Sequence, residues 1–66
     1  MCEIAVFINE NGTSERIARN IIRAESMEGC TSLLDSRGNV IKVDGTYIAV
    51  IDFTENRISL KKIKRG

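Results

Sequence analysis

The chain has 66 residues, of which 42% are hydrophobic, with ten basic and nine acidic side chains, two cysteines and no histidine. This length predicts a single domain over residues 1–66, and a chain of this size buries only about 60% of the surface that it exposes when unfolded. The two cysteines and the missing histidines exclude a disulfide framework and a zinc site with several ligands from one chain, and the net charge of +1 gives little attraction for a polyanion.

The apolar residues favour β-strands, because ten of them are Ile and four are Val, against only three Leu. Turn signals recur at regular intervals and divide the chain into six short segments. The signals are Asn11-Gly12, Glu28-Gly29, Arg37-Gly38-Asn39, Asp44-Gly45 and Glu55-Asn56. This spacing is typical of a small β-sandwich or β-barrel.

In the first segment, residues 2–8, the even-numbered side chains share one face of a predicted strand and the odd-numbered side chains share the other. Both faces are largely apolar from Ile4 onward, so we expect one to face the core and the other a second subunit. The alternation places the Cys2 sulfur at the edge of a buried face. Glu3 points to the opposite face and is interpreted as a solvated charge.

The segment from Thr13 to Ala24 fits two patterns. A helical stripe is formed by Ile17, Ala18, Ile21 and Ile22, with Thr13 or Ser14 as a cap. The residues from Ile22 to Ser26 alternate between apolar or small and charged, as a strand would. We predict one short helical turn over residues 14–19, followed by a strand over residues 20–26.

Four further strands are predicted, over Cys30–Asp35, Val40–Val43, Tyr47–Phe53 and Arg57–Ile63. The first of them is expected to pair with the strand over residues 20–26, and Asp44-Gly45 is expected to form a tight hairpin. The nearly continuous apolar run from Tyr47 predicts a central strand. The fold prediction is an all-β domain, a small antiparallel, partly open six-stranded barrel of the size of SH3 and Sm folds.

The location expected for the chain is the cytoplasm. The first ten residues lack the basic region of a signal peptide, and no stretch reaches the roughly 18 apolar residues that cross a membrane. Thiols stay reduced in the cytoplasm, so Cys2 and Cys30 are predicted to be free. A core this small needs further stabilisation, and a homodimer is the simplest form of it.

Cys2 is the residue with the most specific chemistry. If Met1 is removed, the free amine and the sulfur of Cys2 can bind one metal ion through a five-membered chelate ring. Cys30 follows Gly29 at the start of a strand and is interpreted as a small core residue, and the aromatic residues Phe7, Tyr47 and Phe53 are assigned to the core as well. No serine has a histidine partner, so the sequence predicts that the protein is not an enzyme.

Basic residues are concentrated at the end of the chain, in Lys61, Lys62, Lys64 and Arg65. They support an alternative function, a small-barrel RNA-binding module that uses this tail, but nucleic acid is the less favoured partner because exposed aromatics interleaved with basic residues are not evident. A third possibility is an adaptor that binds another protein through an exposed sheet edge.

The Met1-Cys2 start, the chain length and the closing segment YIAVIDFTENRISL resemble the CooT family of small nickel-binding proteins. The resemblance covers nearly the whole chain and transfers one functional position, Cys2. It implies a homodimer of small β-barrels that binds Ni(II) near the subunit interface and assists the maturation of a client nickel enzyme such as carbon monoxide dehydrogenase.

The donor chemistry agrees with this resemblance. One chain offers at most two good ligands at its N-terminus, whereas two chains around a twofold axis offer two sulfurs and two nitrogens from their Cys2 residues. That donor set suits square-planar Ni(II) or Cu(II), and the Irving–Williams order favours copper, so the choice of nickel must come from supply and from partners. We therefore predict a nickel-binding accessory protein or metallochaperone with a metal site at Cys2.

Overall fold

The computed structural model describes residues 3–64, which form seven strands and no helix. In chain order the strands are β1 (Ala5–Glu10), β2 (Thr13–Ala18), β3 (Ile21–Met27), β4 (Cys30–Asp35), β5 (Val40–Asp44), β6 (Thr46–Asp52) and β7 (Arg57–Lys62). The all-β prediction is confirmed. Over the described residues there is accordingly no helix of the length and apolarity that a membrane span requires.

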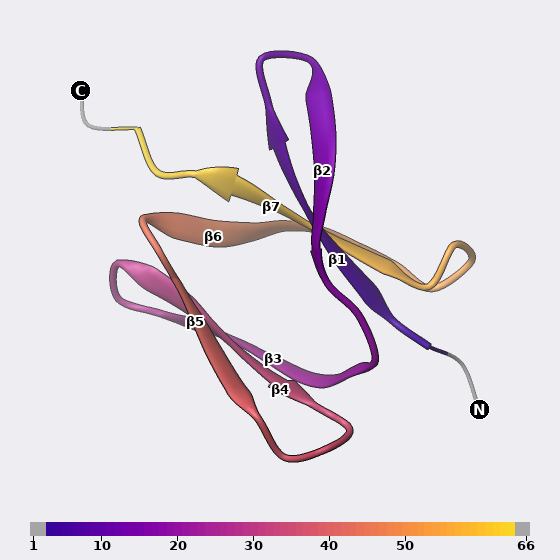
Figure 1. Ribbon diagram of the computed structural model, residues 1–66. Coiled ribbons are helices and arrows are strands. Elements are labelled where there is room, and N and C mark those ends of the chain that lie inside the picture. The colour runs from indigo at the N-terminus through magenta and orange to yellow at the C-terminus, as the bar shows by residue number, and fades with distance from the viewer. Residues whose placement is uncertain (1–2, 65–66) are drawn as a thin grey trace.

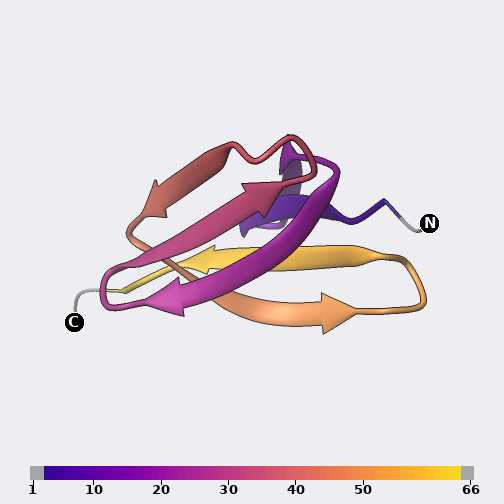
Figure 2. The ribbon, with the colours of Figure 1, turned by 90° about the horizontal axis from the view of Figure 1, so that it is seen from below.

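Two sheets make up the fold (Figure 1). A four-stranded sheet has the order β2-β1-β7-β6, and a three-stranded sheet has the order β3-β4-β5. All neighbouring strands are antiparallel except β1 and β7, which run parallel at the centre of the four-stranded sheet, as the turned view also shows (Figure 2). The two sheets do not close into a barrel, so the predicted barrel is better described as two packed sheets.

The core lies between these sheets. Val6, Ile58 and Leu60 contribute from the four-stranded sheet, and Ile21 and Leu33 contribute from the other side. The predicted alternation of the first strand is confirmed. Val6 is fully buried, and Ile4 and Ile8, two residues before and after it, pack against the core from the same face.

A buried polar contact joins the two sheets. Thr31 on β4 and Thr46 on β6 are both fully or almost fully buried, and their hydroxyl oxygens lie 3.0 Å apart in a hydrogen bond. The Thr46 hydroxyl donates its proton to the carbonyl oxygen of Val43 at 2.7 Å, so that Thr31 is the donor in the contact between the two hydroxyls. Both hydroxyls are thereby satisfied inside the core, where an unpaired polar group would be costly.

The helical turn predicted over residues 14–19 is wrong, because Thr13–Ala18 forms strand β2. Asn11 and Gly12 both have positive φ and make a two-residue hairpin loop that returns the chain along β1. A bulge in this pair then turns the consecutive residues Ile17 and Ala18 toward the core. Two adjacent residues that both face the core imitate the spacing of a helical stripe. With β2 as an additional strand, the described residues form seven strands where six were predicted.

Three further details differ from the predictions. The strands are not all antiparallel, because β1 pairs with β7 in parallel. Asp44-Gly45 does not close a hairpin: it takes the chain from β5 in one sheet to β6 in the other. Finally, β6 is an edge strand, although its apolar sequence predicted a central one, and Val50 and Ile51 are exposed on it.

Two backbone hydrogen bonds of Gly45 hold the connection between β5 and β6 in place. Its N–H donates to the Gly29 carbonyl oxygen at 2.7 Å, and its own carbonyl accepts the Ile63 N–H at 2.8 Å. The residue has a φ of 69°, a conformation that glycine adopts without a steric penalty.

The predicted pairing of Cys30–Asp35 with the strand before it is confirmed, since β4 pairs with β3 on one side and with β5 on the other.

Replacing Leu33 with Ala is expected to lower the free energy of unfolding by about 2–5 kcal/mol, because the residue is fully buried and its loss leaves a cavity. A core of this size supplies only about 3–5 kcal/mol, so the variant should be largely unfolded at room temperature. Urea denaturation followed by circular dichroism measures the change. The control Val40→Ala removes an exposed side chain and should cost less than about 1 kcal/mol; equal losses in the two variants would contradict this description of the core.

Candidate functional site

The predicted metal ligand, Cys2, lies outside the described residues. The structure does show how the chain that follows it is held. The Ile4 carbonyl accepts the N–H of Ile21 at 3.0 Å, and the Ala5 N–H donates to the Asn56 carbonyl at 3.1 Å. Residues 4 and 5 are thus tied to the second sheet and to the turn before β7. Glu3 is exposed, as predicted.

No second metal site competes for the predicted role within residues 3–64, where no group of three or more Cys, Asp or Glu side chains is placed to hold an ion. Cys30 is a free thiol, as predicted. Its assignment to the core was wrong: it is half-buried and lies on the outer face of β4, because the buried residues Thr31 and Leu33 alternate with it. Its neighbours in register are Met27 and Asp44.

Large hydrophobic side chains are unusually exposed in the isolated chain. The exposed residues are Ile22, Met27, Val40, Ile41, Tyr47, Val50, Ile51, Phe53 and Ile63. Two of the three aromatics that were assigned to the core are among them, since Tyr47 is 42% exposed and Phe53 is 82% exposed, and the third, Phe7, is half-buried on the outer face. The exposed side chains come from strands of both sheets and from the segments after β6 and β7.

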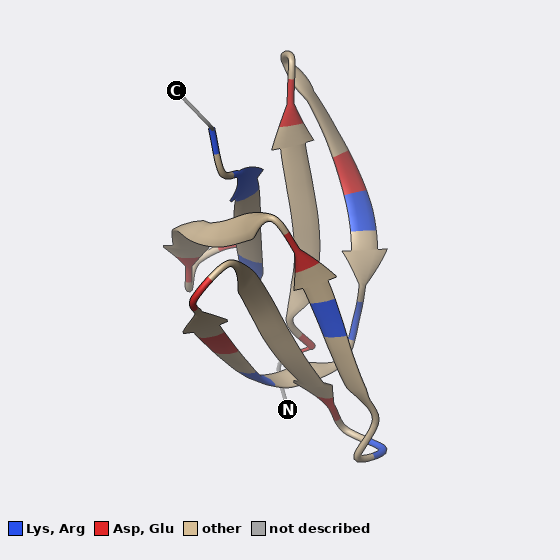
Figure 3. Ribbon diagram, turned by 90° about the vertical axis from the view of Figure 1, so that its left-hand side faces the viewer, with Lys and Arg blue, Asp and Glu red and all other residues tan. Residues whose placement is uncertain are grey.

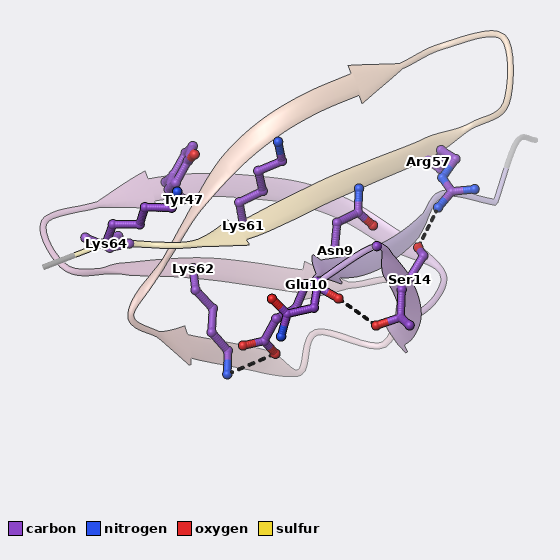
Figure 4. Close-up of a pocket in the computed structure, with 12 residues that line it drawn as sticks. Asn9, Glu10, Ser14, Tyr47, Arg57, Lys61, Lys62 and Lys64 are labelled. Carbon is purple, nitrogen blue, oxygen red and sulfur yellow. Dashed lines mark hydrogen bonds and ion pairs between the residues drawn. The ribbon is translucent and has the colours of Figure 1, made fainter.

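A cleft of about 770 Å³, larger than the one beside the β4–β5 turn, lies between the β1–β2 hairpin and the end of β7 (Figure 4). Its lining is polar and basic, with side chains from all four strands of the four-stranded sheet. The basic members are Arg57, Lys61, Lys62 and Lys64. The predicted basic tail therefore forms one wall of a defined cleft, as far as it lies within the described residues.

Arg57 is held in place by two neighbours. Its guanidinium carbon lies 3.9 Å from the centroid of the Phe7 ring, and its Nη2 donates to the Ser14 hydroxyl oxygen at 3.1 Å. A cation over an aromatic face gains about 0.5–1 kcal/mol at an exposed site. Phe7 is thus covered by a charged group on the outer face and takes no part in the core.

The smaller cleft, of about 220 Å³, borders the β4–β5 turn and contains Asp35. Asp35 Oδ1 accepts the backbone N–H groups of Arg37 at 2.9 Å and Asn39 at 2.8 Å, and Oδ2 accepts the Asn39 side-chain amide at 3.1 Å. The hydrogen bond from the Asn39 backbone is the largest cause that lowers the pKa of Asp35 below its ordinary value of 3.8, and it outweighs the opposing effect of desolvation. This carboxylate therefore stabilises a turn.

The chain is similar to known proteins in its fold. No family model matches the chain, and no curated protein is similar enough in sequence to count as a match. A solved structure described as "putative CooT from Carboxydothermus hydrogenoformans" aligns with a TM-score of 0.80 and 21% sequence identity, over 96% of this chain and 100% of that one. The two chains share one fold.

The resemblance to CooT stated from the sequence is thereby confirmed at the level of the fold. The match covers nearly all of both chains. What sequence reasoning missed is the cleft. Its residues come from four separate strands, and only the alternation of polar residues along residues 57–61 could have indicated a polar face.

Asp35→Ala is expected to destabilise the protein at pH 7 and to lose this effect in acid. Because the folded pKa is depressed below the ordinary value of 3.8, the ionised carboxylate stabilises the folded state above that value, and the contribution disappears as the pH falls through the folded pKa. Urea midpoints of the variant and the unmodified protein should differ at pH 7 and converge as the pH falls below 3.8 and on through the depressed pKa. Asp44→Ala, an exposed carboxylate at the end of β5, is the control; a difference that stays constant with pH would refute this role.

Proposed function

We propose that this protein is an accessory protein that binds Ni(II) as cargo and delivers it to a nickel enzyme, carbon monoxide dehydrogenase being the client class that the CooT resemblance implies. The observation that carries the proposal is the agreement of two independent features. The fold matches that of a protein called CooT over almost the entire length of both chains, and the sequence begins with Met1-Cys2.

The donor set of the described residues supports a site that includes Cys2. There is no histidine in the chain, and residues 3–64 offer no cluster of acidic or thiol ligands. A nickel site therefore needs the Cys2 thiolate, and one chain alone provides too few ligands. Two copies of Cys2 supply two sulfurs, and two N-terminal nitrogens complete a square-planar set that suits Ni(II).

A homodimer is part of the proposal because it provides this second Cys2. The size of the chain and its surface support it: within residues 3–64, five hydrophobic residues are buried in the core, while eight large hydrophobic side chains besides Tyr47 are exposed. Burying such side chains against a second copy adds the apolar contact that a domain of 66 residues lacks. The dimer would act in the cytoplasm, where both thiols stay reduced.

The proposed role is binding and transfer without turnover of a substrate. Ligand thiols must lose their protons to bind the metal, so nickel binding releases protons and weakens as the pH falls. This pH dependence favours release of the ion wherever the thiolates become protonated or are replaced by ligands of the client. No residue is assigned a catalytic role.

Cys2→Ser should abolish tight nickel binding, since it removes both sulfurs from the dimer. The matched control is Cys30→Ser, which changes the other thiol and should leave nickel affinity unchanged. Isothermal titration with NiCl₂, together with circular dichroism to verify the fold, distinguishes the two variants. Tight binding that survives in Cys2→Ser but is lost in Cys30→Ser would place the site elsewhere and contradict the proposal.

The shared site also fixes the stoichiometry and the oligomeric state. Native mass spectrometry of the protein with one added equivalent of NiCl₂ is expected to show one Ni(II) in each dimer, and the intact mass reports whether Met1 is present. One tightly bound ion in each monomer would rule out a site shared by two chains. A monomer that binds no nickel but captures a protein partner would favour the adaptor function.

A further inference from the structure

The outer face of the four-stranded sheet carries a row of polar and aromatic side chains, one from each strand. Asn9 on β1 is in register with Ser14 on β2 and with Lys61 on β7, and Lys61 is in register with Tyr47 on β6. Neighbouring strands lie about 4.8 Å apart, so the row extends over roughly 14 Å. All four residues line the larger cleft. Figure 4 shows Asn9, Lys61 and Tyr47 projecting in the same direction.

The charges of this cleft are largely uncompensated. Glu10 is its one carboxylate among the described residues, and Lys62 already neutralises it at 3.3 Å. Within residues 3–64, neither Lys61 nor Lys64 has a carboxylate within 4 Å. Basic residues follow one another along the end of β7 and beyond it (Figure 3). Together with Arg57, the cleft therefore presents three cationic groups to a ligand although the whole chain has a net charge of only +1.

Two further features point to a ligand with aromatic rings and hydrogen-bonding edges. The Tyr47 ring is 42% exposed beside Lys61, so an aromatic side chain and a cation lie next to each other on one strand pair. Asn9 also lines the cleft, and its side-chain amide nitrogen points in the direction of the Lys61 side chain (Figure 4). An amide N–H group in that position can donate a hydrogen bond to a ligand.

We propose that this face binds single-stranded nucleic acid. Lys61, Lys64 and Arg57 would contact the phosphates, Tyr47 would stack on a base, and the Asn9 side-chain amide would donate a hydrogen bond to a base edge. Binding of single strands depends on this combination of a basic groove and exposed aromatic rings. An acidic peptide would also be attracted by the cations, but it would leave the roles of Tyr47 and Asn9 unfilled. The proposal uses neither Cys2 nor a metal and is therefore independent of the proposed nickel function.

The test is fluorescence anisotropy with a labelled 12-nucleotide single-stranded RNA of mixed sequence, at 50 mM NaCl, titrated with the full chain. Binding is expected within the range of about 10⁻⁶–10⁻⁴ M that sequence-independent contacts provide. Raising the salt should weaken it with a slope of about −0.7 for each phosphate contact in a log–log plot. Single-stranded DNA should bind similarly, and a duplex RNA of the same length should bind more weakly because its bases are not available for stacking.

Matched variants separate stacking and charge from general effects. Tyr47→Ala should weaken binding at least about fivefold while Tyr47→Phe retains it, because either ring can stack on a base. Phe53→Ala, which removes an aromatic ring that is even more exposed but lies outside the cleft, should have no effect. Lys61→Gln should reduce the salt slope by about 0.7, whereas Lys42→Gln on the other sheet should leave it unchanged.

Three results would overturn the proposal. One is the absence of binding up to about 10⁻⁴ M protein. Another is an equal weakening of RNA binding in the cleft variants and in their controls, which would indicate general electrostatic attraction without a defined binding site. The last is equal or tighter binding of a labelled polyglutamate peptide, which would assign the cleft to acidic proteins. Cys2→Ser should bind the RNA as the unmodified protein does, so failure of the nickel proposal and failure of this one are distinguishable.

Discussion

The parallel pairing of β1 with β7 is the contact on which the rest of the molecule depends. It joins the two ends of the chain at the centre of one sheet. One face of this strand pair carries Val6, Ile58 and Leu60, which are three of the five hydrophobic residues buried within residues 3–64. The other face carries Asn9 and Lys61, which line the cleft. Because successive side chains alternate between the faces, a shift of one residue in this register would move apolar side chains outward and the polar ones into the core.

Much of the strand pattern could be predicted from the sequence, because turn residues with special backbone geometry mark the boundaries. Asn11-Gly12, Gly29 and Asn56 adopt positive φ and lie between strands, where the sequence placed turns. The order of the strands could not be predicted in the same way. It depends on the contact between the first and last strands, which no local pattern encodes. Residues 14–19 were misassigned because a bulge brings two adjacent residues to the core and so imitates helical periodicity.

The candidate sites differ in how far the sequence reveals them. Cys2 is recognisable because a single residue type at a single position carries the chemistry, but it lies outside the described residues, so its metal role stays a prediction. The cleft is the opposite case. Ser14, Asn9, Lys61 and Tyr47 are unremarkable alone and meet only through three strand pairings. Tyr47 was assigned to the core because an apolar segment does not reveal whether its strand is central or at an edge; here β6 is an edge strand, and the ring projects to the surface.

The connection of β1 to β7 also sets the order in which the chain can assemble during synthesis. The three-stranded sheet consists of consecutive strands joined by short turns, so its pairings are available as soon as residue 44 has left the ribosome. The hairpin of β1 and β2 is made first, yet the edge of β1 that pairs with β7 stays open until the last strand arrives, and Ile58 and Leu60 of the core arrive with it. Completion of the core therefore waits for the end of translation, and the newly made N-terminal hairpin is the part of the chain most in need of protection against aggregation in the meantime.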